Sequence, residues 1–269
     1  MAKPKKKPNR YEKIIERLFF AHYKSGLREL EVHRDEIPPI AAKLKIVLPD
    51  NIGDILYSFR YRTRLPESIL KIARDDEEWL IRPAGKSRYK FVLVPKIELA
   101  PNAALARVKV PDSTPGIIAR YALNDEQALL ARLRYNRLID IFLGVTCYSL
   151  QNHLRTSVAS LGQIETDEVY VGIDRGGAHY VVPVQAKGGR DRLNVVQIEQ
   201  DLAMCAGKFP DMICRPVGAQ FSSDGAIILF ELEMTGDGIR IRNERHYLLV
   251  PSDELSAEEL RSYRLPAGS

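Results

Sequence analysis

Asp167, Gln185 and Lys187 are the residues whose types and spacing best suit hydrolysis at a bound metal ion. Mg²⁺ prefers oxygen ligands and keeps several waters, so the Asp167 carboxylate, the Gln185 amide oxygen and the Ala186 carbonyl form a suitable donor set. A bound metal polarises a phosphoryl oxygen and lowers the pKa of water. The Lys187 ammonium can orient that water or stabilise negative charge in the transition state. This set predicts phosphodiester hydrolysis.

Two predicted strands position these residues. Apolar residues alternate with other types over residues 168–173, which predicts a half-buried strand. Residues 180–187 predict a second strand, after a turn at 175–177. Because the end of the second strand of a hairpin lies beside the start of the first, we expect Asp167 to meet Lys187.

The alternation of side chains along the second strand decides which groups reach the site. Residues i and i+2 share a face, so Gln185 and Lys187 should project together while Ala186 points into the core. A cross-strand salt bridge between Asp167 and Lys187 on an ordinary sheet is the structural alternative, and such surface pairs stabilise by only ~0–1 kcal/mol.

Asp167, followed 18 positions later by Gln-Ala-Lys at a strand end, resembles the PD-(D/E)XK nuclease superfamily in a QXK variant. The resemblance covers about residues 117–250. It implies an α/β domain with a mixed sheet flanked by helices, as in type II restriction endonucleases. It also implies that Asp167 binds Mg²⁺, with Mn²⁺ as a substitute, and that Lys187 assists the water. Gln185 stands where the family usually has a carboxylate, which removes one negative charge.

Three acids are candidates to complete the metal site. Glu165 lies two residues before Asp167 and is counted among the catalytic candidates. The family resemblance also implies an acid on the helix before the first strand, and Glu126 and Asp140 both fit that position. The choice among the three stays open at this point.

Residues 188–192 form a Gly-Gly-Arg-Asp-Arg segment directly after Lys187. Its glycines permit close approach of the backbone to a ligand. Arg190 and Arg192 could hold phosphates. We therefore count both arginines among the predicted DNA contacts.

The N-terminal part of the chain resembles a winged helix-turn-helix domain, a small α+β fold, over about residues 10–95. The order of predicted elements carries the resemblance: three main helices followed by a hairpin, at residues 11–23, 36–44 and 52–59, then 79–82 and 89–94. In such domains the third helix enters the major groove and the hairpin lies on the DNA backbone. A small α+β domain that binds protein is the alternative.

Polar and basic residues on the third helix and the hairpin are the expected contacts to double-stranded DNA. They would hold phosphates or base edges. The predicted set is Asn51, Tyr57, Ser58, Arg60, Arg62, Lys86 and Arg88.

Charge is distributed unevenly along the chain. The first 95 residues carry 21 Lys and Arg against 13 Asp and Glu, whereas the whole chain has a net charge of +5. A basic module favours a phosphate backbone as partner, because neutralised phosphates release counterions. Residues 1–9 are a Lys- and Pro-rich segment that we expect to be a flexible basic tail.

The remaining segments complete the predicted organisation. Residues 96–116, rich in Pro and Ala, are the expected linker, with one strand at 106–110. The nuclease domain then spans 117–269. Within it we expect helices at 124–143, 146–157 and 195–207, and strands at 212–220 and 226–234.

Composition favours a cytoplasmic protein. The N-terminus lacks the apolar core of a secretory signal, and no apolar run approaches the ~18 residues of a membrane helix. Cys147, Cys205 and Cys214 lack the spacing of a metal site and are expected to be free thiols.

The sequence and the family resemblance together predict a magnesium-dependent DNA endonuclease of the restriction-modification type. The resemblance to restriction enzymes further implies a homodimer, because cutting both strands takes two active sites. A non-catalytic winged-helix DNA-binding regulator is one alternative, which Gln185 favours. A repair or structure-selective nuclease is another.

Overall fold

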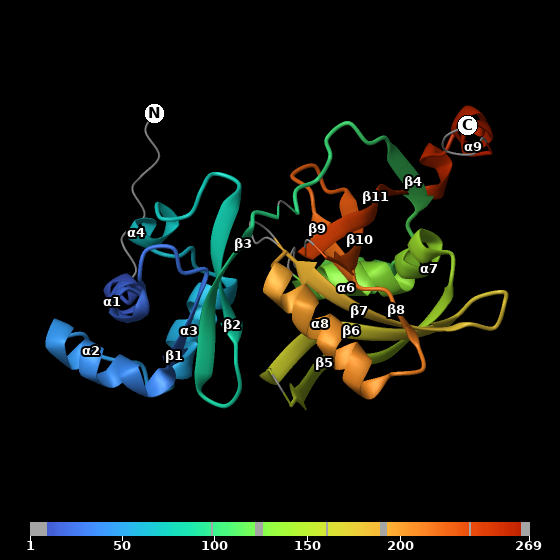
Figure 1. Ribbon diagram of the computed structural model, residues 1–269. Coiled ribbons are helices and arrows are strands. Elements are labelled where there is room, and N and C mark those ends of the chain that lie inside the picture. The colour runs from blue at the N-terminus through green and yellow to red at the C-terminus, as the bar shows by residue number, and fades with distance from the viewer. Residues whose placement is uncertain are drawn as a thin grey trace, which may run out of the picture. The chain divides into compact units, whose positions relative to one another are not determined.

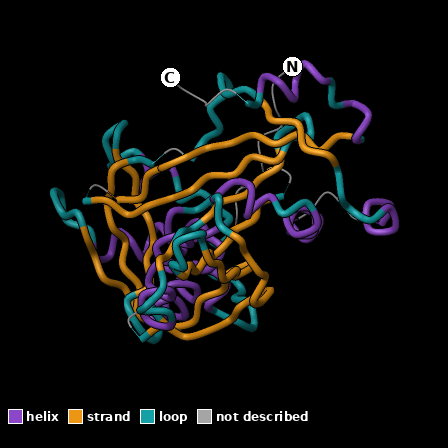
Figure 2. Tube along the Cα trace, turned by 90° about the vertical axis from the view of Figure 1, so that its right-hand side faces the viewer, coloured by secondary structure: helices purple, strands orange, loops and turns teal. Residues whose placement is uncertain are grey.

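The computed structural model describes residues 10–97, 99–121, 126–159, 161–188, 193–236 and 238–264. It is a mixed α/β protein in which helices and strands occur throughout the chain (Figure 2). The chain divides into two compact units. The first contains Met1–Glu98, Thr156–Ile164 and Asn194–Gln200, and the second contains Leu99–Arg155, Glu165–Leu193 and Asp201–Ser269.

The first unit is built on a three-stranded antiparallel sheet with helices packed on it (Figure 1). The strand order is β1-β3-β2. Its elements in chain order are α1 (Glu12–His22), β1 (Glu29–His33), η1 (Arg34–Glu36), α2 (Ile37–Leu44), α3 (Gly53–Tyr61), α4 (Glu67–Leu70), β2 (Glu77–Pro83) and β3 (Arg88–Pro95).

An aromatic cluster forms the centre of the first unit. Phe19 of α1 makes edge-to-face contacts with Trp79 at 5.0 Å and Phe91 at 5.2 Å between ring centroids. β1 was not predicted from the sequence, although Leu30 and Val32 are buried and alternate with exposed residues, which is the period of a strand.

The second unit contains a large mixed sheet with strand order β4-β11-β10-β9-β7-β6-β5, and β8 pairs with β7 (Figure 1). β7 runs antiparallel to β6 and parallel to β9. The strands are β4 (Arg107–Pro111), β5 (Thr146–Val158), β6 (Gly162–Ile173), β7 (His179–Lys187), β8 (Ile213–Cys214), β9 (Val217–Phe221), β10 (Ile227–Thr235) and β11 (Gly238–Val250).

Helices cover the large sheet on both faces. Val182, Val184 and Ala186 of β7 pack in one core with leucines of α6, whereas Gln185 between them bonds to a residue of α8. Since neighbouring residues on a strand point to opposite faces, α6 and α8 cover opposite faces. The helices are α5 (Gly116–Tyr121), α6 (Glu126–Tyr135), α7 (Leu138–Leu143), α8 (Val195–Lys208) and α9 (Ala257–Ser262), with a short η2 at Ser252–Glu254.

The prediction of one continuous helix over residues 124–143 is wrong, because α6 ends at Tyr135 and α7 begins at Leu138. Arg137 has a left-handed φ of 50°, which interrupts the helix. The side chain of Asn136 accepts a hydrogen bond from the backbone of Ser113 at 2.7 Å and donates one to Thr114 at 3.0 Å. These contacts with a distant segment stabilise the break.

The prediction of a helix over residues 146–157 is also wrong, because the segment forms the edge strand β5 beside β6. Most residues of β5 are exposed, so the strand lacks the alternating burial that identifies a half-buried strand from sequence. Pairing with β6, which no local pattern encodes, decides its conformation.

Smaller differences affect the rest of the sheet. The strand expected over 212–220 is two strands, β8 and β9, separated at Pro216, which has no N–H for a ladder hydrogen bond. β11 was not predicted.

β6 is buried on both faces at residues 168–170, so the half-buried pattern does not hold there. The strand predicted inside the 96–116 segment is β4, which pairs in parallel with β11.

Candidate active site on the β6–β7 hairpin

Asp167 and Lys187 lie together at one end of the β6–β7 hairpin. The ordered pairing runs from Ile173↔His179 to Glu168↔Val184. Just beyond the last pair, Asp167 Oδ2 accepts a 2.8 Å hydrogen bond from the Ala186 N–H. Lys187 Nζ lies 3.8 Å from the same oxygen, and both side chains are largely buried, at 13% exposed for Asp167 and 11% for Lys187. The hairpin brings the two groups together as the sequence indicated.

A second carboxylate comes from α6. Glu126, in the first turn of α6, places Oε1 3.5 Å from Lys187 Nζ. Asp140 instead pairs with Arg137 and accepts a hydrogen bond from the Cys147 N–H at 3.0 Å. Of the two acids considered on the preceding helix, Glu126 is therefore the one near Lys187.

Gln185 is buried and held in one orientation. Its Nε2 donates to Asp201 Oδ2 at 2.9 Å and to the backbone oxygen of Glu165 at 3.4 Å. Both partners are acceptors, so the amide nitrogen must face them. Gln185 Oε1 is buried and has no hydrogen-bond partner among the described residues. A buried acceptor without a partner costs free energy unless something binds it.

Asp201 on α8 is a member of the cluster that sequence reasoning missed. Its Oδ1 accepts a 2.6 Å hydrogen bond from Thr166 Oγ1, and its Oδ2 accepts from Gln185, so both oxygens are used. Burial raises the pKa of this carboxyl to about 7. A signal was present, since Asp201 lies three residues after the buried Ile198 and thus on the inward stripe of the helix.

Burial also raises the pKa of Asp167 above its ordinary value. The Lys187 ammonium and the hydrogen bond from the Ala186 N–H act in the opposite direction, because both favour the charged carboxylate. Asp167 is thus a poorly solvated carboxyl group whose one ion-pair partner among the described residues is Lys187. Such a group gains from an additional positive charge.

Glu165 points elsewhere. Its Oε1 lies 3.3 Å from Arg155 Nη2 and 3.6 Å from His153 Nδ1, both on β5. Only its backbone oxygen contacts the cluster, through Gln185. Its contribution as a catalytic side chain stays a prediction.

The oxygen donors near Lys187 fit a hard divalent cation. Among the described residues no group of three or more His, Cys, Asp and Glu is arranged to hold a metal. Mg²⁺ does not need such a cage, because it typically takes one or two carboxylates and keeps several waters. Asp167, Glu126 and the unpartnered Gln185 Oε1 supply two carboxylates and one neutral oxygen. Ala186 contributes its N–H to Asp167, and its side chain lies in the core.

The predicted DNA contacts of the first unit differ in exposure. Asn51, Tyr57, Arg62, Lys86 and Arg88 are exposed. Asn51 Oδ1 accepts from the Gly53 N–H at the start of α3. Arg62 lies over the Tyr57 ring at 5.3 Å. These side chains are accessible to a ligand.

Two other predicted contacts are engaged within the first unit. Ser58 Oγ is hydrogen-bonded to Thr63 Oγ1 at 2.8 Å. The Arg60 guanidinium stacks over the Tyr61 ring at 4.2 Å and bonds its hydroxyl group. Arg190 and Arg192 lie outside the described residues.

No family model matches the chain, and no curated protein matches it.

In the part of the chain that the structure describes, no helix has the length and apolar character needed to cross a membrane. All three cysteines are free; Cys147 and Cys205 are buried and Cys214 is partly buried.

Proposed function

We propose that this protein is a magnesium-dependent DNA endonuclease that hydrolyses phosphodiester bonds in double-stranded DNA. One observation carries the proposal: Lys187 Nζ lies 3.8 Å from Asp167 and 3.5 Å from Glu126. Gln185, two residues before Lys187 on β7, adds a buried amide oxygen that has no partner among the described residues. Two carboxylates, a neutral oxygen and an ammonium form a set suited to phosphoryl chemistry. The proposal extends to membership of the PD-(D/E)XK superfamily.

The residues have separate roles in this proposal. Asp167, Glu126 and Gln185 Oε1 would hold Mg²⁺, or Mn²⁺ in its place. The bound ion would supply Lewis acidity and a water of lowered pKa. Lys187 would orient the attacking water and stabilise the negative charge that develops on the phosphoryl oxygens. Asp201 and Thr166 would keep the Gln185 amide in the orientation that leaves Oε1 free.

The first unit supports a DNA-binding role. Its element order, α1-β1-η1-α2-α3-α4-β2-β3 with a three-stranded sheet, is compatible with a winged helix in which α3 would be the third helix and β2–β3 the wing. The basic residues named above on α3 and the wing would contact double-stranded DNA. We further propose a cytoplasmic homodimer, because cutting both strands takes two active sites.

A plasmid assay tests the proposal. Supercoiled DNA is incubated with the protein and Mg²⁺, then with added EDTA, and nicked and linear forms are quantified. Lys187→Ala should lower the cleavage rate by at least about 100-fold, the magnitude expected for loss of a group that stabilises the transition state. Lys208→Ala, which removes an exposed lysine at the end of α8, should leave the rate unchanged. Cleavage that survives EDTA or Lys187→Ala would come from elsewhere and would refute the proposal.

A second candidate is a DNA-binding protein without nuclease activity. The observation that favours it is that a neutral residue, Gln185, occupies the family's usual acid position and bonds Asp201 in the interior. In that case Lys187 would serve only as the buried counter-ion of Asp167 and Glu126. Tight binding of duplex DNA with no cleavage in Mg²⁺ or Mn²⁺ would support this candidate.

A further inference from the structure

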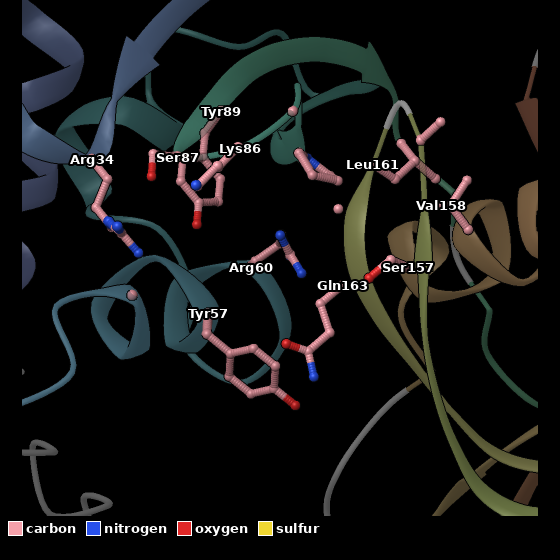
Figure 3. Close-up of a pocket in the computed structure, with 15 residues that line it drawn as sticks. Arg34, Tyr57, Arg60, Lys86, Ser87, Tyr89, Ser157, Val158, Leu161 and Gln163 are labelled. Atoms are coloured by element: carbon pink, nitrogen blue, oxygen red, sulfur yellow. The ribbon is translucent and has the colours of Figure 1, made fainter.

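A cavity of about 740 Å³ lies within the first unit (Figure 3). Residues from η1, α3, β2, β3 and the turn between them line it, together with residues 157–159 and 161–163 at the end of the β5–β6 hairpin. The volume is within the ~300–1,000 Å³ typical of small-ligand sites. The cavity contains none of the residues assigned to the hydrolytic cluster.

The lining is positively charged. Arg34, Arg60 and Lys86 line the cavity, and none of its described lining residues is acidic. Their side chains come from three different elements and extend toward the same space (Figure 3). Neither Arg34 nor Lys86 forms a salt bridge with any described residue, in contrast to Arg88 beside them, which pairs with Glu31 at 3.8 Å. Convergent cations without counter-ions suit an anionic ligand such as a phosphate.

The rest of the lining suits a planar, hydrogen-bonding group. Tyr57 and Tyr89 are part of the wall. The Tyr57 side chain is 37% exposed, so one part of its ring is accessible for stacking. Gln163, from the hairpin end, extends its amide group to the side of the Tyr57 ring in the view of Figure 3 and offers both a donor and an acceptor. Stacking on an aromatic ring together with amide contacts is how proteins hold an unstacked base.

We propose that this cavity binds one nucleotide, with its phosphate between Arg34 and Lys86 and its base against Tyr57 and Gln163. The ligand chemistry is a phosphate joined to a planar base. It can come from a free nucleotide or from an unstacked nucleotide of a DNA strand. The site is distinct from the hydrolytic cluster, so its existence does not depend on the proposed hydrolysis, although Tyr57, Arg60 and Lys86 are shared with the proposed DNA-binding surface.

Binding measurements on the full chain test the site. Adenosine 5′-monophosphate, inorganic phosphate and a four-nucleotide DNA single strand are titrated separately by calorimetry, without divalent metal so that no strand is cut. We expect the nucleotide or the strand to bind at least about tenfold more tightly than phosphate, because stacking adds to the charge attraction. Binding of the free nucleotide identifies it as a sufficient ligand, and binding of the strand alone identifies DNA as the source.

Variants separate the cavity from general positive charge. Arg34→Ala and Lys86→Ala should each weaken nucleotide or strand binding about tenfold, as expected for loss of a charged hydrogen bond. Tyr57→Ala should weaken nucleotide or strand binding by a similar factor, whereas Tyr57→Phe should retain that binding because the ring is kept. Lys43→Ala is the matched control, since Lys43 is exposed on α2 and outside the cavity.

Thermal unfolding of every variant is recorded, and Lys86→Gln replaces Lys86→Ala if alanine destabilises the turn. The proposal fails if neither the nucleotide nor the strand binds. It also fails if phosphate binds as tightly as the nucleotide and the strand, or if Lys43→Ala weakens binding as much as Arg34→Ala does.

Discussion

Asp201 accepts a 2.9 Å hydrogen bond from the amide nitrogen of Gln185, and this contact determines which end of the amide is left without a partner. Because both Asp201 oxygens accept hydrogen bonds, the Gln185 nitrogen faces Asp201 and the oxygen faces away. A carboxylate on α8 thus controls a donor atom on β7. The orientation of the Gln185 amide therefore decides whether its oxygen is available to a metal ion.

Asp201→Asn should weaken metal binding while the fold is kept. An asparagine amide that still accepts from Thr166 presents its NH₂ group to Gln185, which then turns its own oxygen toward it and withdraws that oxygen from the metal. We expect Mn²⁺ affinity to fall about 10- to 100-fold, as is usual when a group that orients a ligand is lost. Electron paramagnetic resonance titration measures the affinity. Unchanged Mn²⁺ affinity in a folded Asp201→Asn variant would show that the orientation of Gln185 does not matter.

Lys187→Met should destabilise the metal-free protein. Asp167 would then remain buried without its closest cation, which costs about 1–3 kcal/mol. Asp167→Asn combined with Lys187→Met should recover part of this loss, since the largely buried charge at residue 167 is then removed and the remaining carboxylate, Glu126, is 38% exposed to solvent. Chemical denaturation of the single and double variants measures the effect. If the losses are simply additive, the two groups are not coupled as the geometry indicates.

Glu126→Gln should affect the cleavage rate, whereas Asp140→Asn should affect stability. Glu126→Gln removes a carboxylate 3.5 Å from Lys187 Nζ and should lower the cleavage rate about 10- to 100-fold with little change in stability. Asp140→Asn weakens the contacts to Arg137 and the Cys147 N–H, and should lower stability by about 1 kcal/mol without affecting the rate at saturating Mg²⁺. Plasmid cleavage and thermal unfolding of both variants distinguish them, and a reversal of the two effects would identify Asp140 as the site acid.

Arg62→Ala should weaken binding to duplex DNA by a similar factor for all sequences if Arg62 contacts phosphate. The slope of log affinity against log salt concentration should then fall in magnitude by about 0.9, which corresponds to one phosphate contact fewer. Arg28→Ala is a suitable control, since Arg28 pairs with Glu77 at 2.7 Å and was not assigned to DNA. Fluorescence anisotropy at several salt concentrations gives both slopes. An equal change in the two variants would indicate a general charge effect.

The attachment of α9 should weaken in acid. A hydrogen bond from Lys109 lowers the pKa of Glu259 to about 2, below its ordinary value of 4.5. A carboxyl with a depressed pKa stabilises the folded state above its unfolded pKa, and this contribution is lost as the pH falls from about 4.5 to 2. The protection of α9 amides, taken as their exchange rate relative to the intrinsic rate at each pH, should therefore fall over this range in the wild type but not in Glu259→Gln, in which the pair is already absent.

The sequence by itself determined the hairpin and the meeting of Asp167 with Lys187. Apolar alternation identified strands 168–173 and 180–187, and the glycines at 176 and 177 marked the turn between them. These are local signals, because side-chain period and turn chemistry depend on neighbours in the chain. Once the hairpin is known, the proximity of the two groups follows from antiparallel pairing alone.

Only the tertiary structure decided which residues from other elements join that hairpin. Glu126 lies near Lys187 and Asp140 does not, because Arg137 breaks the expected helix and turns the two acids to different places. Asp201 reaches Gln185 because α8 packs on the face of the sheet opposite α6. Packing between elements that are distant in sequence determines these contacts. The periodicity of one element predicts which of its faces is buried, but not which other element packs on that face.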